Sequence, residues 1–188
     1  MEREQNMTES YNTYLSIPLI SYNVISYLIE NNENIFKLLY YNDPNAWRSD
    51  SNHPNLTKSQ KGSLIFDGIK PQTNCRIFMD TGNDDSWQVE STQLRISVVK
   101  GVPTNHVFGY ITVGFEVYSH YKINTLSNYT TRDMVILQQL IETLNGKEID
   151  GIGILFFDYR QGGESKFINI GIPPYKGKGL TMCNYVLE

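Results

Sequence analysis

The stretch that decides the fold runs from Val107 to Phe157 and reads VFGYITVGFEVYSHYKINTLSNYTTRDMVILQQLIETLNGKEIDGIGILFF. Its first part, from Val107 to Ser119, alternates apolar and polar residues, which is typical of a strand with one buried face. The length of this strand favours a central position in an antiparallel sheet. The expected apolar face consists of Val107, Ile111, Val113, Phe115 and Val117.

A helix is predicted next, over residues 131–145. Its apolar residues recur at helical spacing and form a stripe on one side. Thr130 or Thr131 can cap its start, and Gly146 stands where many helices end in a left-handed residue. The stripe consists of Met134, Leu137, Leu140, Ile141 and Leu144.

The flanking sequence predicts two further helices and the other strands. An amphipathic helix begins near Ile20, with Ser21 or Asn23 as possible caps, and the polar residues 31–34 break it before apolar residues resume up to Tyr41. Helices first, then antiparallel strands with one packed helix, indicate an α+β fold with a mainly antiparallel sheet. The remaining strands are expected at 75–79, 94–99, 152–157, 167–172 and 180–186, with a turn at Gly162-Gly163.

The domain organisation follows from where the regular patterns stop. Residues 1–16 are polar and are expected to form a mobile tail, whereas residues 17–188 are expected to form one domain. A long loop at 42–62 carries Trp47 among polar neighbours, and loops of this length are usually functional or disordered. Within it, Thr57 and Gln60 have the spacing of a capping box, which predicts a short helix.

Composition excludes several functional classes. The formal net charge of the 188 residues is -4, so the chain is unsuited to gripping nucleic acid through clustered cations. The two cysteines lack metal-ligand spacing and are expected to be buried free thiols in a reducing compartment. Residues 1–10 are too polar for a secretory signal, and the run 17–29 is too short to span a bilayer. Thirteen tyrosines suit a protein contact surface, and they equally suit ordinary strands.

Three consecutive residues match a known catalytic signature. Asp80-Thr81-Gly82 resembles the active-site triplet of retropepsin-like aspartic proteases, in which two carboxylates, one from each subunit, share a proton. Gly151-Ile152-Gly153 could serve as their later glycine segment, although the helix at 131–145 has no place between the two motifs. Calcium, zinc, phosphate-loop and nucleophile patterns are all incomplete, so neither a cofactor nor a metal site is expected.

A dispersed pattern from Asn42 to Val186 resembles a known family. The segments that carry it are Asn42-Asp43-Pro44, Pro54-Asn55-Leu56-Thr57, Leu64-Ile65-Phe66-Asp67-Gly68, Cys75-Arg76-Ile77-Phe78, Phe115-Glu116-Val117-Tyr118-Ser119-His120, Lys122-Ile123-Asn124-Thr125-Leu126, Arg132, Leu144-Asn145-Gly146-Lys147 and Gly151-Ile152-Gly153-Ile154-Leu155-Phe156-Phe157. They are similar to neck proteins of tailed bacteriophages, the head-to-tail connectors, and within these to the tail terminator or tail-completion type. The resemblance implies a non-enzymatic virion subunit, assembled in the host cytoplasm, that forms a ring, commonly a hexamer.

In such a neck, the ring would lie between a head connector or stopper and the tail tube, with DNA as passing cargo and no membrane contact. A ring subunit needs a stiff sheet and protruding loops. We therefore expect Trp47 and Arg48 to meet the adjacent ring, and Tyr118, His120 and Tyr121 to meet the neighbouring subunit. The alternatives are a peptidase that uses Asp80, or another virion module such as a baseplate or capsid-decorating protein.

Overall fold

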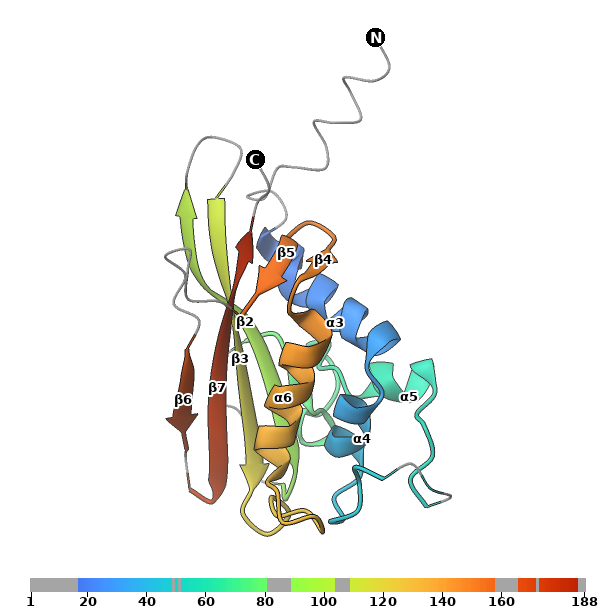
Figure 1. Ribbon diagram of the computed structural model, residues 1–188. Helices are drawn as coiled ribbons and strands as arrows, with labels where there is room; N and C mark the ends of the chain where they lie inside the picture. The colour runs from blue at the N-terminus through green and yellow to red at the C-terminus, as the bar shows by residue number, and fades with distance from the viewer. Residues whose placement is uncertain are drawn as a thin grey trace.

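The computed structural model describes residues 17–48, 50, 52–80, 89–103, 109–157, 166–171 and 173–185. It confirms an α+β fold, in which helices pack on one face of a curved sheet (Figure 1). The predicted tail at 1–16 and the turn at Gly162-Gly163 lie outside the described residues. The helical segments are η1 (Ile17–Leu19), α3 (Ile20–Asn31), α4 (Asn34–Tyr40), α5 (Lys58–Ser63), η2 (Gln72–Asn74) and α6 (Arg132–Leu144). The strands are β1 (Ile77–Phe78), β2 (Thr92–Pro103), β3 (Gly109–His120), β4 (Lys147–Ile149), β5 (Gly153–Phe156), β6 (Phe167–Ile170) and β7 (Tyr175–Tyr185).

The sheet has the strand order β1-β2-β3-β7-β5-β4. The long strand β3 pairs antiparallel with β2 on one side and with β7 on the other, which confirms its predicted central position. The far edge of β7 is shared, because β6 pairs with its first half and β5 with its last residues. The sequence patterns did not predict β4, nor that β1 runs parallel to β2 with Ile77 opposite Leu94.

The core lies between the helical layer and the inner face of β3. The predicted apolar residues Ile111, Val113, Phe115 and Val117 are fully buried, while Val107 lies outside the described residues. They belong to one apolar cluster with residues from α3, α4 and α6. The predicted stripe of α6 is wrong at its start, since Met134 is 42% exposed. The first turn of α6 borders an open groove rather than the core, and the buried residues of the helix are Arg132, Asp133, Ile136, Leu137, Leu140 and Leu144.

Helix ends agree only partly with the caps expected from the sequence. The caps expected at Ser21 or Asn23 are wrong, because α3 begins at Ile20 and has no side-chain cap. Instead Ser21 Oγ donates to the carbonyl of Ile96 at 3.2 Å and Asn23 Nδ2 to that of Asp150 at 2.9 Å. Both side chains therefore join α3 to the sheet layer rather than to its own backbone.

The helix break and most of the other helix ends predicted from the sequence are present in the structure. The helix break at 31–34 is confirmed, as is the Thr57–Gln60 capping box that starts α5. Thr131 stands at the start of α6 with extended backbone, but its side chain makes no capping hydrogen bond. Gly146 has a φ of +72°, which confirms the left-handed residue expected after this helix.

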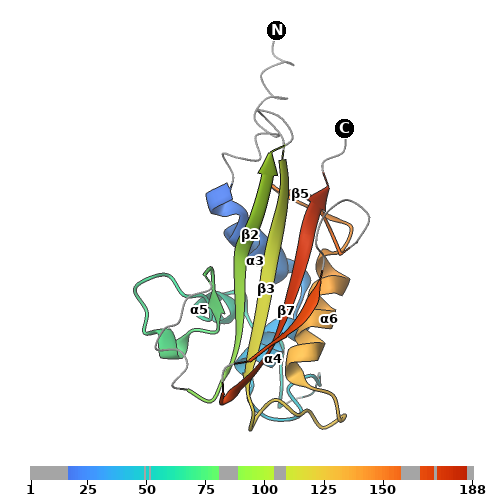
Figure 2. The same ribbon diagram turned by 90° about the vertical axis from the view of Figure 1, so that its left-hand side faces the viewer.

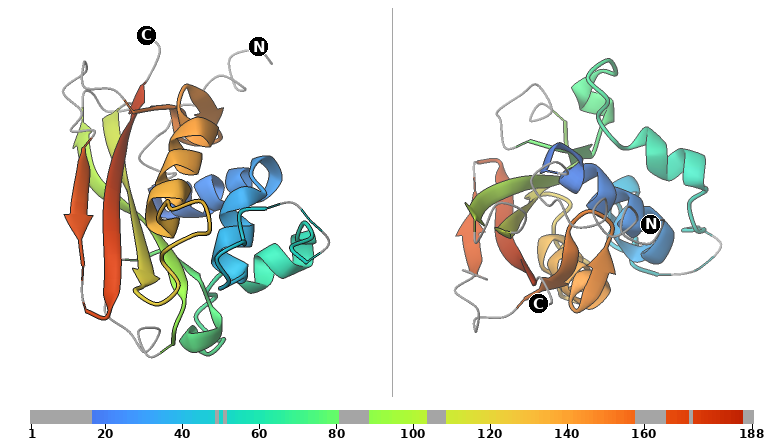
Figure 3. Two further views of the ribbon diagram at one scale, coloured as in Figure 1. Left: turned by 60° about the horizontal axis from the view of Figure 1, so that its bottom comes forward. Right: turned by 90° about the horizontal axis from the view of Figure 1, so that it is seen from above.

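On the sheet face opposite the helices, a glycine of β7 leaves room for an aromatic ring of β3. Figure 2 shows β2, β3 and β7 on this face with the helical layer behind them, and Figure 3 shows the same two layers from below and from above. Gly177 pairs with Tyr118, whose ring lies over it, and a Cβ at Gly177 would come within 2.7 Å of that ring. The ring can lie flat against the strand only because residue 177 has no side chain.

Candidate interaction surface

Four connecting segments lie together at the end of the sheet where β3 leaves it (Figure 1), and we call them the loop end: residues 41–48, 89–91, 121–131 and 173–175. Hydrogen bonds join them pairwise. They run from Ser127 N to Pro44 O (2.9 Å), from Tyr121 N to Pro174 O (3.1 Å) and from Asn42 Nδ2 to Glu90 O (3.0 Å). Segments far apart in the sequence thus form one surface.

Arg132 is the buried support of the loop end. It is the first residue of α6, and its side chain is fully buried. The guanidinium donates to four main-chain carbonyls instead of to a carboxylate, and burial lowers the pKa of Arg132 to about 10, although nearby Asp43 acts in the opposite direction. The four acceptors are Leu38 O (2.6 Å), Tyr41 O (2.6 Å), Asp43 O (2.8 Å) and Ile123 O (3.0 Å). The helix start therefore fixes the exit of α4 and the loop after β3 in one place.

His53 closes the loop that carries Trp47. Its Nε2 lies 2.7 Å from Asp43 Oδ2 and its Nδ1 lies 2.9 Å from Asp50 Oδ1, so each ring nitrogen meets a carboxylate. The hydrogen bond with Asp43 is the main reason that the pKa of His53 is raised, and Asp50 adds to it. The pKa of Asp50 is lowered by the same imidazole. That of Asp43 is also lowered, because hydrogen bonds from Asn45 N and His53 outweigh its burial. The arrangement favours an imidazolium between two carboxylates.

Trp47 and Arg48, predicted to contact the adjacent ring, stand on this closed loop. Trp47 is 36% exposed, and its Nε1 donates to Ser127 Oγ at 3.2 Å across the loop end. The Arg48 guanidinium carbon lies 5.5 Å from the centre of the indole ring. The Nζ of buried Lys37 donates to the main-chain carbonyl of Arg48. The pair is therefore held in position while part of the indole stays accessible.

Tyr118, His120 and Tyr121, the predicted subunit contacts, differ in exposure. Tyr118 and His120 are buried in the chain, whereas Tyr121 is 54% exposed. Burial, then the charge of Glu116, raises the pKa of Tyr118 to about 12, and its hydroxyl donates to Glu116 Oε2 at 3.1 Å. His120 lies against Tyr175, with ring centres 5.4 Å apart. Tyr121 is the member of this trio with a large free surface, and the contact role of all three stays a prediction.

The loop end has one exposed residue that sequence patterns did not indicate. Tyr129 is 96% exposed and has a φ of +64°, a conformation that residues other than glycine and asparagine rarely adopt. Two hydrogen bonds hold this turn: Tyr129 N donates to Leu126 O at 3.0 Å, and Thr130 N donates to Asn128 Oδ1 at 3.2 Å. Strained residues of this kind often belong to functional sites. The local sequence does not predict a left-handed backbone conformation at Tyr129.

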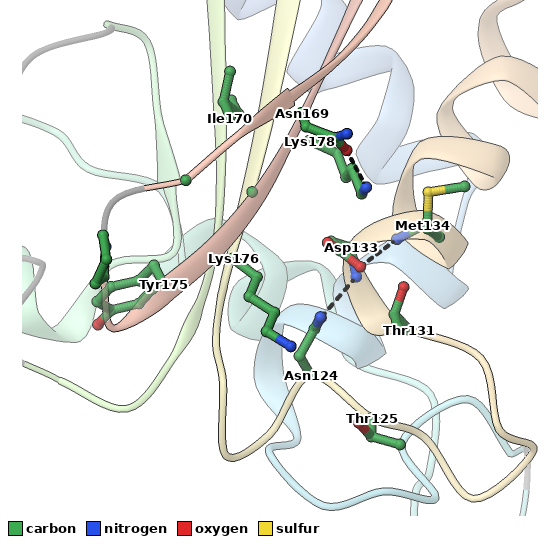
Figure 4. Close-up of a pocket in the computed structure, with 13 residues that line it drawn as sticks. Asn124, Thr125, Thr131, Asp133, Met134, Asn169, Ile170, Tyr175, Lys176 and Lys178 are labelled. Carbon is green, nitrogen blue, oxygen red and sulfur yellow. Dashed lines mark hydrogen bonds between the residues drawn. The ribbon is translucent and has the colours of Figure 1, made fainter.

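An open groove of about 570 Å³ lies beside the loop end (Figure 4). One wall is the start of α6 with Asp133 and Met134, and the other is the β6–β7 hairpin with Lys176 and Lys178. The sequence analysis singled out none of these residues as a site. The sequence signal at this wall is weak, since Asp133 is one of several polar residues in the amphipathic pattern of α6.

The residues of the peptidase alternative lie apart. Asp80 follows β1 at one edge of the sheet, and its Oδ1 accepts from Arg95 Nη1 at 3.0 Å. Gly151-Ile152-Gly153 follows β4 and ends at the first residue of β5, at the opposite edge. Thr81 and Gly82 lie outside the described residues. The structure thus pairs Asp80 with a buried arginine and does not bring the two motifs together.

Other possible chemical sites can be checked on the described part of the chain. Within it, no three His, Cys, Asp or Glu residues are placed to hold a metal ion. Cys75 and Cys183 are both buried free thiols, as predicted. None of the helices in these ranges has the length and apolar character needed to cross a membrane.

The fold and the loop end together define an α+β protein with one exposed end built from connecting loops. The model of the YomW family matches residues 32–180, and the chain belongs to this family. YomW is a phage-associated family, derived from genomes like that of Bacillus phage SPBc2. No curated protein and no solved structure matches the chain.

Proposed function

We propose that this protein is a structural virion subunit of a tailed phage, of the tail terminator or tail-completion type. Copies form a ring, commonly a hexamer, in the neck between the head connector or stopper and the tail tube. The protein acts by assembly and carries no catalytic residues. Membership of a phage-associated family supports the virion setting, and the sequence resemblance to neck proteins supports the position.

The observation that carries the proposal is the construction of the loop end. Three exposed aromatic residues, Trp47, Tyr121 and Tyr129, stand on one end of a long sheet. Their loops are held by the buried Arg132. Exposed aromatic side chains on a rigid support lose little entropy when a partner covers them, and they are frequent at the centres of protein interfaces. A surface of this kind suits contact with an adjacent layer of a stacked assembly.

The charge of the chain fits DNA as passing cargo. With a net charge of -4, a lumen formed by such subunits would not hold a polyanion through clustered cations. DNA could then slide through without being arrested. Lysines added to the residues that a ring structure identifies as lumen-facing should retard DNA exit.

The decisive experiment measures the mass and symmetry of the purified full-length protein. Mass photometry over a range of concentrations, followed by negative-stain electron microscopy, should show a closed ring of identical subunits. Addition of the tail tube protein from the same phage should give stacked particles. A monomer under every condition, including with the tube protein present, would overturn the proposal.

A further inference from the structure

The loop that carries Trp47 is closed by one imidazole that lies between two carboxylates. Asp43, Asp50 and His53 form this group, which we call the His53 cluster. Asp43 precedes Trp47 in the chain, whereas Asp50 and His53 follow it. The contact from His53 Nε2 to Asp43 Oδ2, at 2.7 Å, therefore joins the two ends of the segment that presents Trp47.

The two contacts of the ring need a proton on each nitrogen. A neutral imidazole has one N–H group, and its other nitrogen carries a lone pair. Asp43 and Asp50 are ionised at neutral pH, because the pKa of each is lowered. In a neutral ring, the nitrogen without a proton would face a carboxylate oxygen at 2.7 or 2.9 Å, and two acceptors form no hydrogen bond. The imidazolium donates to both carboxylates, whereas a neutral ring must give up one of them.

The contact that a neutral ring gives up is the one with Asp43. Asp50 lies three positions before His53, and its Oδ1 also accepts from Asn52 N and from His53 N, both at 3.0 Å. This turn keeps Asp50 beside Nδ1 whatever the charge of the ring. Asp43 is ten positions away and meets the ring through its side chain. The neutral ring therefore keeps its proton on Nδ1, and the lone pair of Nε2 then faces Asp43.

The other groups that face the cluster keep their protonation state while His53 titrates. Tyr41, at the end of α4, packs edge-on against the imidazole with ring centres 5.2 Å apart. Burial raises the pKa of Tyr41 above its ordinary value of about 10, so the phenol stays neutral. Arg132 of α6, with a pKa of about 10, stays charged near Asp43. His53 is thus the member of this group whose charge changes near neutral pH.

The position of Trp47 depends on this closure. Its Nε1 donates to Ser127 Oγ at 3.2 Å, which is a long hydrogen bond between neutral groups. The contact between His53 and Asp43 is shorter and charge-assisted, so it holds the loop more firmly. The Arg48 guanidinium lies over the indole, so a movement of Trp47 also displaces this cation.

We propose that the His53 cluster is a pH-sensitive switch for the contact that Trp47 and Arg48 make with the adjacent layer of the assembly. The imidazolium keeps the loop closed and the pair in position to bind. Loss of its proton opens the contact with Asp43 and releases the pair, so binding is strongest at mildly acidic pH. By linkage, a bound partner makes His53 hold its proton more tightly. The inference rests on the proposed function, because it regulates the same contact.

Fluorescence of the full-length chain tests the switch in the protein itself. The chain has two tryptophans, so Trp87→Phe leaves Trp47 as the emitting one. From about pH 5.5 to about pH 8.5, Trp47 emission should shift to longer wavelength and its quenching by acrylamide should rise, with the midpoint of the His53 titration. His53→Gln in the same background should give a flat profile, since glutamine does not titrate. A flat profile with His53 present, or an equal shift in His53→Gln, would overturn the inference.

Asp43→Asn should keep the loop closed without the second proton. Its amide nitrogen would stand in place of Oδ2 and donate to the lone pair of Nε2, while Oδ1 still accepts from Asn45 N. Trp47 emission of this variant at about pH 8.5 should therefore equal that of the parent chain at about pH 5.5. Asp67→Asn is the matched control, because Asp67 also accepts main-chain hydrogen bonds in a turn but lies outside the loop end. It should keep the parent profile.

Stacking experiments show whether the switch controls the contact with a partner. Rings are mixed with the tail tube protein and, separately, with the head connector of the same phage, and stacks are counted by mass photometry at both pH values. In at least one mixture the stacked fraction should fall at the higher pH. Asp43→Asn should keep its stacks there, which excludes an effect of pH on the partner.

The two proposals fail in different ways. Stacks that are independent of pH in both mixtures, or that Asp43→Asn loses as the parent does, would overturn the inference and leave the proposed function standing. Absence of rings at every pH would overturn the proposed function and, with it, the link from His53 to assembly.

Discussion

Arg132 Nη2 donates to the main-chain oxygen of Asp43 at 2.8 Å, although the two residues are 89 positions apart. The bond joins the start of α6 to the loop that carries Trp47. The carboxylate of Asp43 meets His53 at the same time, so one residue connects the buried arginine with the imidazole. The exposed loop end is therefore supported by a continuous polar network that reaches into the core.

Replacing Arg132 should destabilise the whole fold. In Arg132→Met, four carbonyl oxygens lose their donor, and the free energy of unfolding should fall by at least about 3 kcal/mol, because an unsatisfied buried acceptor costs about 1–3 kcal/mol. Urea unfolding followed by circular dichroism measures this difference. Lys58→Met is the control, since Lys58 is exposed and its ion-pair partner Glu30 is exposed too. Equal losses in the two variants would refute the supporting role of Arg132.

The His53 contacts predict a pH-dependent stability. The pKa of His53 is raised in the folded state, so its contribution is complete below the unfolded value of about 6.5 and is lost as pH rises through the folded pKa. The pKa values of Asp43 and Asp50 are lowered, so their contribution is present above about pH 4 and is lost as pH falls. The difference in unfolding free energy between wild type and His53→Gln should be largest between about pH 4 and 6.5.

The same contacts can be followed directly by NMR. The imidazole of His53 should titrate above the ordinary histidine range of about 6.5, and Asp50→Asn should move it back toward that range. Asp50→Asn keeps the shape of the side chain and removes one of the two carboxylates. An unchanged titration in this variant would show that Asp50 does not set the pKa.

The periodic spacing of apolar residues predicted the helices and strands that bury one face against the core. Alternation in β3 and helical spacing in α6 are set by neighbours in the sequence, and both elements appear within a few residues of the predicted ranges. The exposed Met134 shows the limit of this reasoning, because the periodic pattern continues beyond the point where the core ends. The strand expected at 75–79 is present as β1, but its parallel pairing depends on β2 farther along the chain, which a local pattern does not show.

The candidate site was less predictable, because its geometry depends on distant residues. Tyr118 belongs to the outward side of a strand pattern, yet its ring is buried because Gly177 on β7 leaves room for it. His53 lay in a polar loop without ligand spacing, and its two carboxylates meet it only after the loop closes. Trp47 was predictable as a lone aromatic residue in that loop, and it is indeed partly exposed.

Gly177 provides a test of the close packing of the Tyr118 ring against β7. A Cβ at this position would lie 2.5 Å from Ile170 O and 2.7 Å from the Tyr118 ring, so Gly177→Ala should lower the unfolding free energy by about 1–3 kcal/mol. Gly101→Ala on β2 is the matched control, because nothing lies within 4 Å of its added Cβ. Chemical unfolding of both variants under the same conditions measures the contrast. A Gly177 variant as stable as the Gly101 variant would mean that the ring of Tyr118 moves away at little cost.

A substitution at Tyr129 is expected to affect the stability of the fold and the assembly of copies in opposite directions. Asparagine tolerates the left-handed conformation better than tyrosine, and the side chain of Tyr129 has almost no contact to lose. Tyr129→Asn should therefore raise the unfolding free energy by up to about 1 kcal/mol. If the tyrosine is kept in this strained state to contact a partner, the same variant should assemble less well in mass photometry. Tyr22→Asn is the control, because Tyr22 is also exposed but lies on α3, outside the loop end. A more stable variant that assembles like wild type would remove Tyr129 from the contact surface, whereas a more stable variant that stays monomeric would place it there.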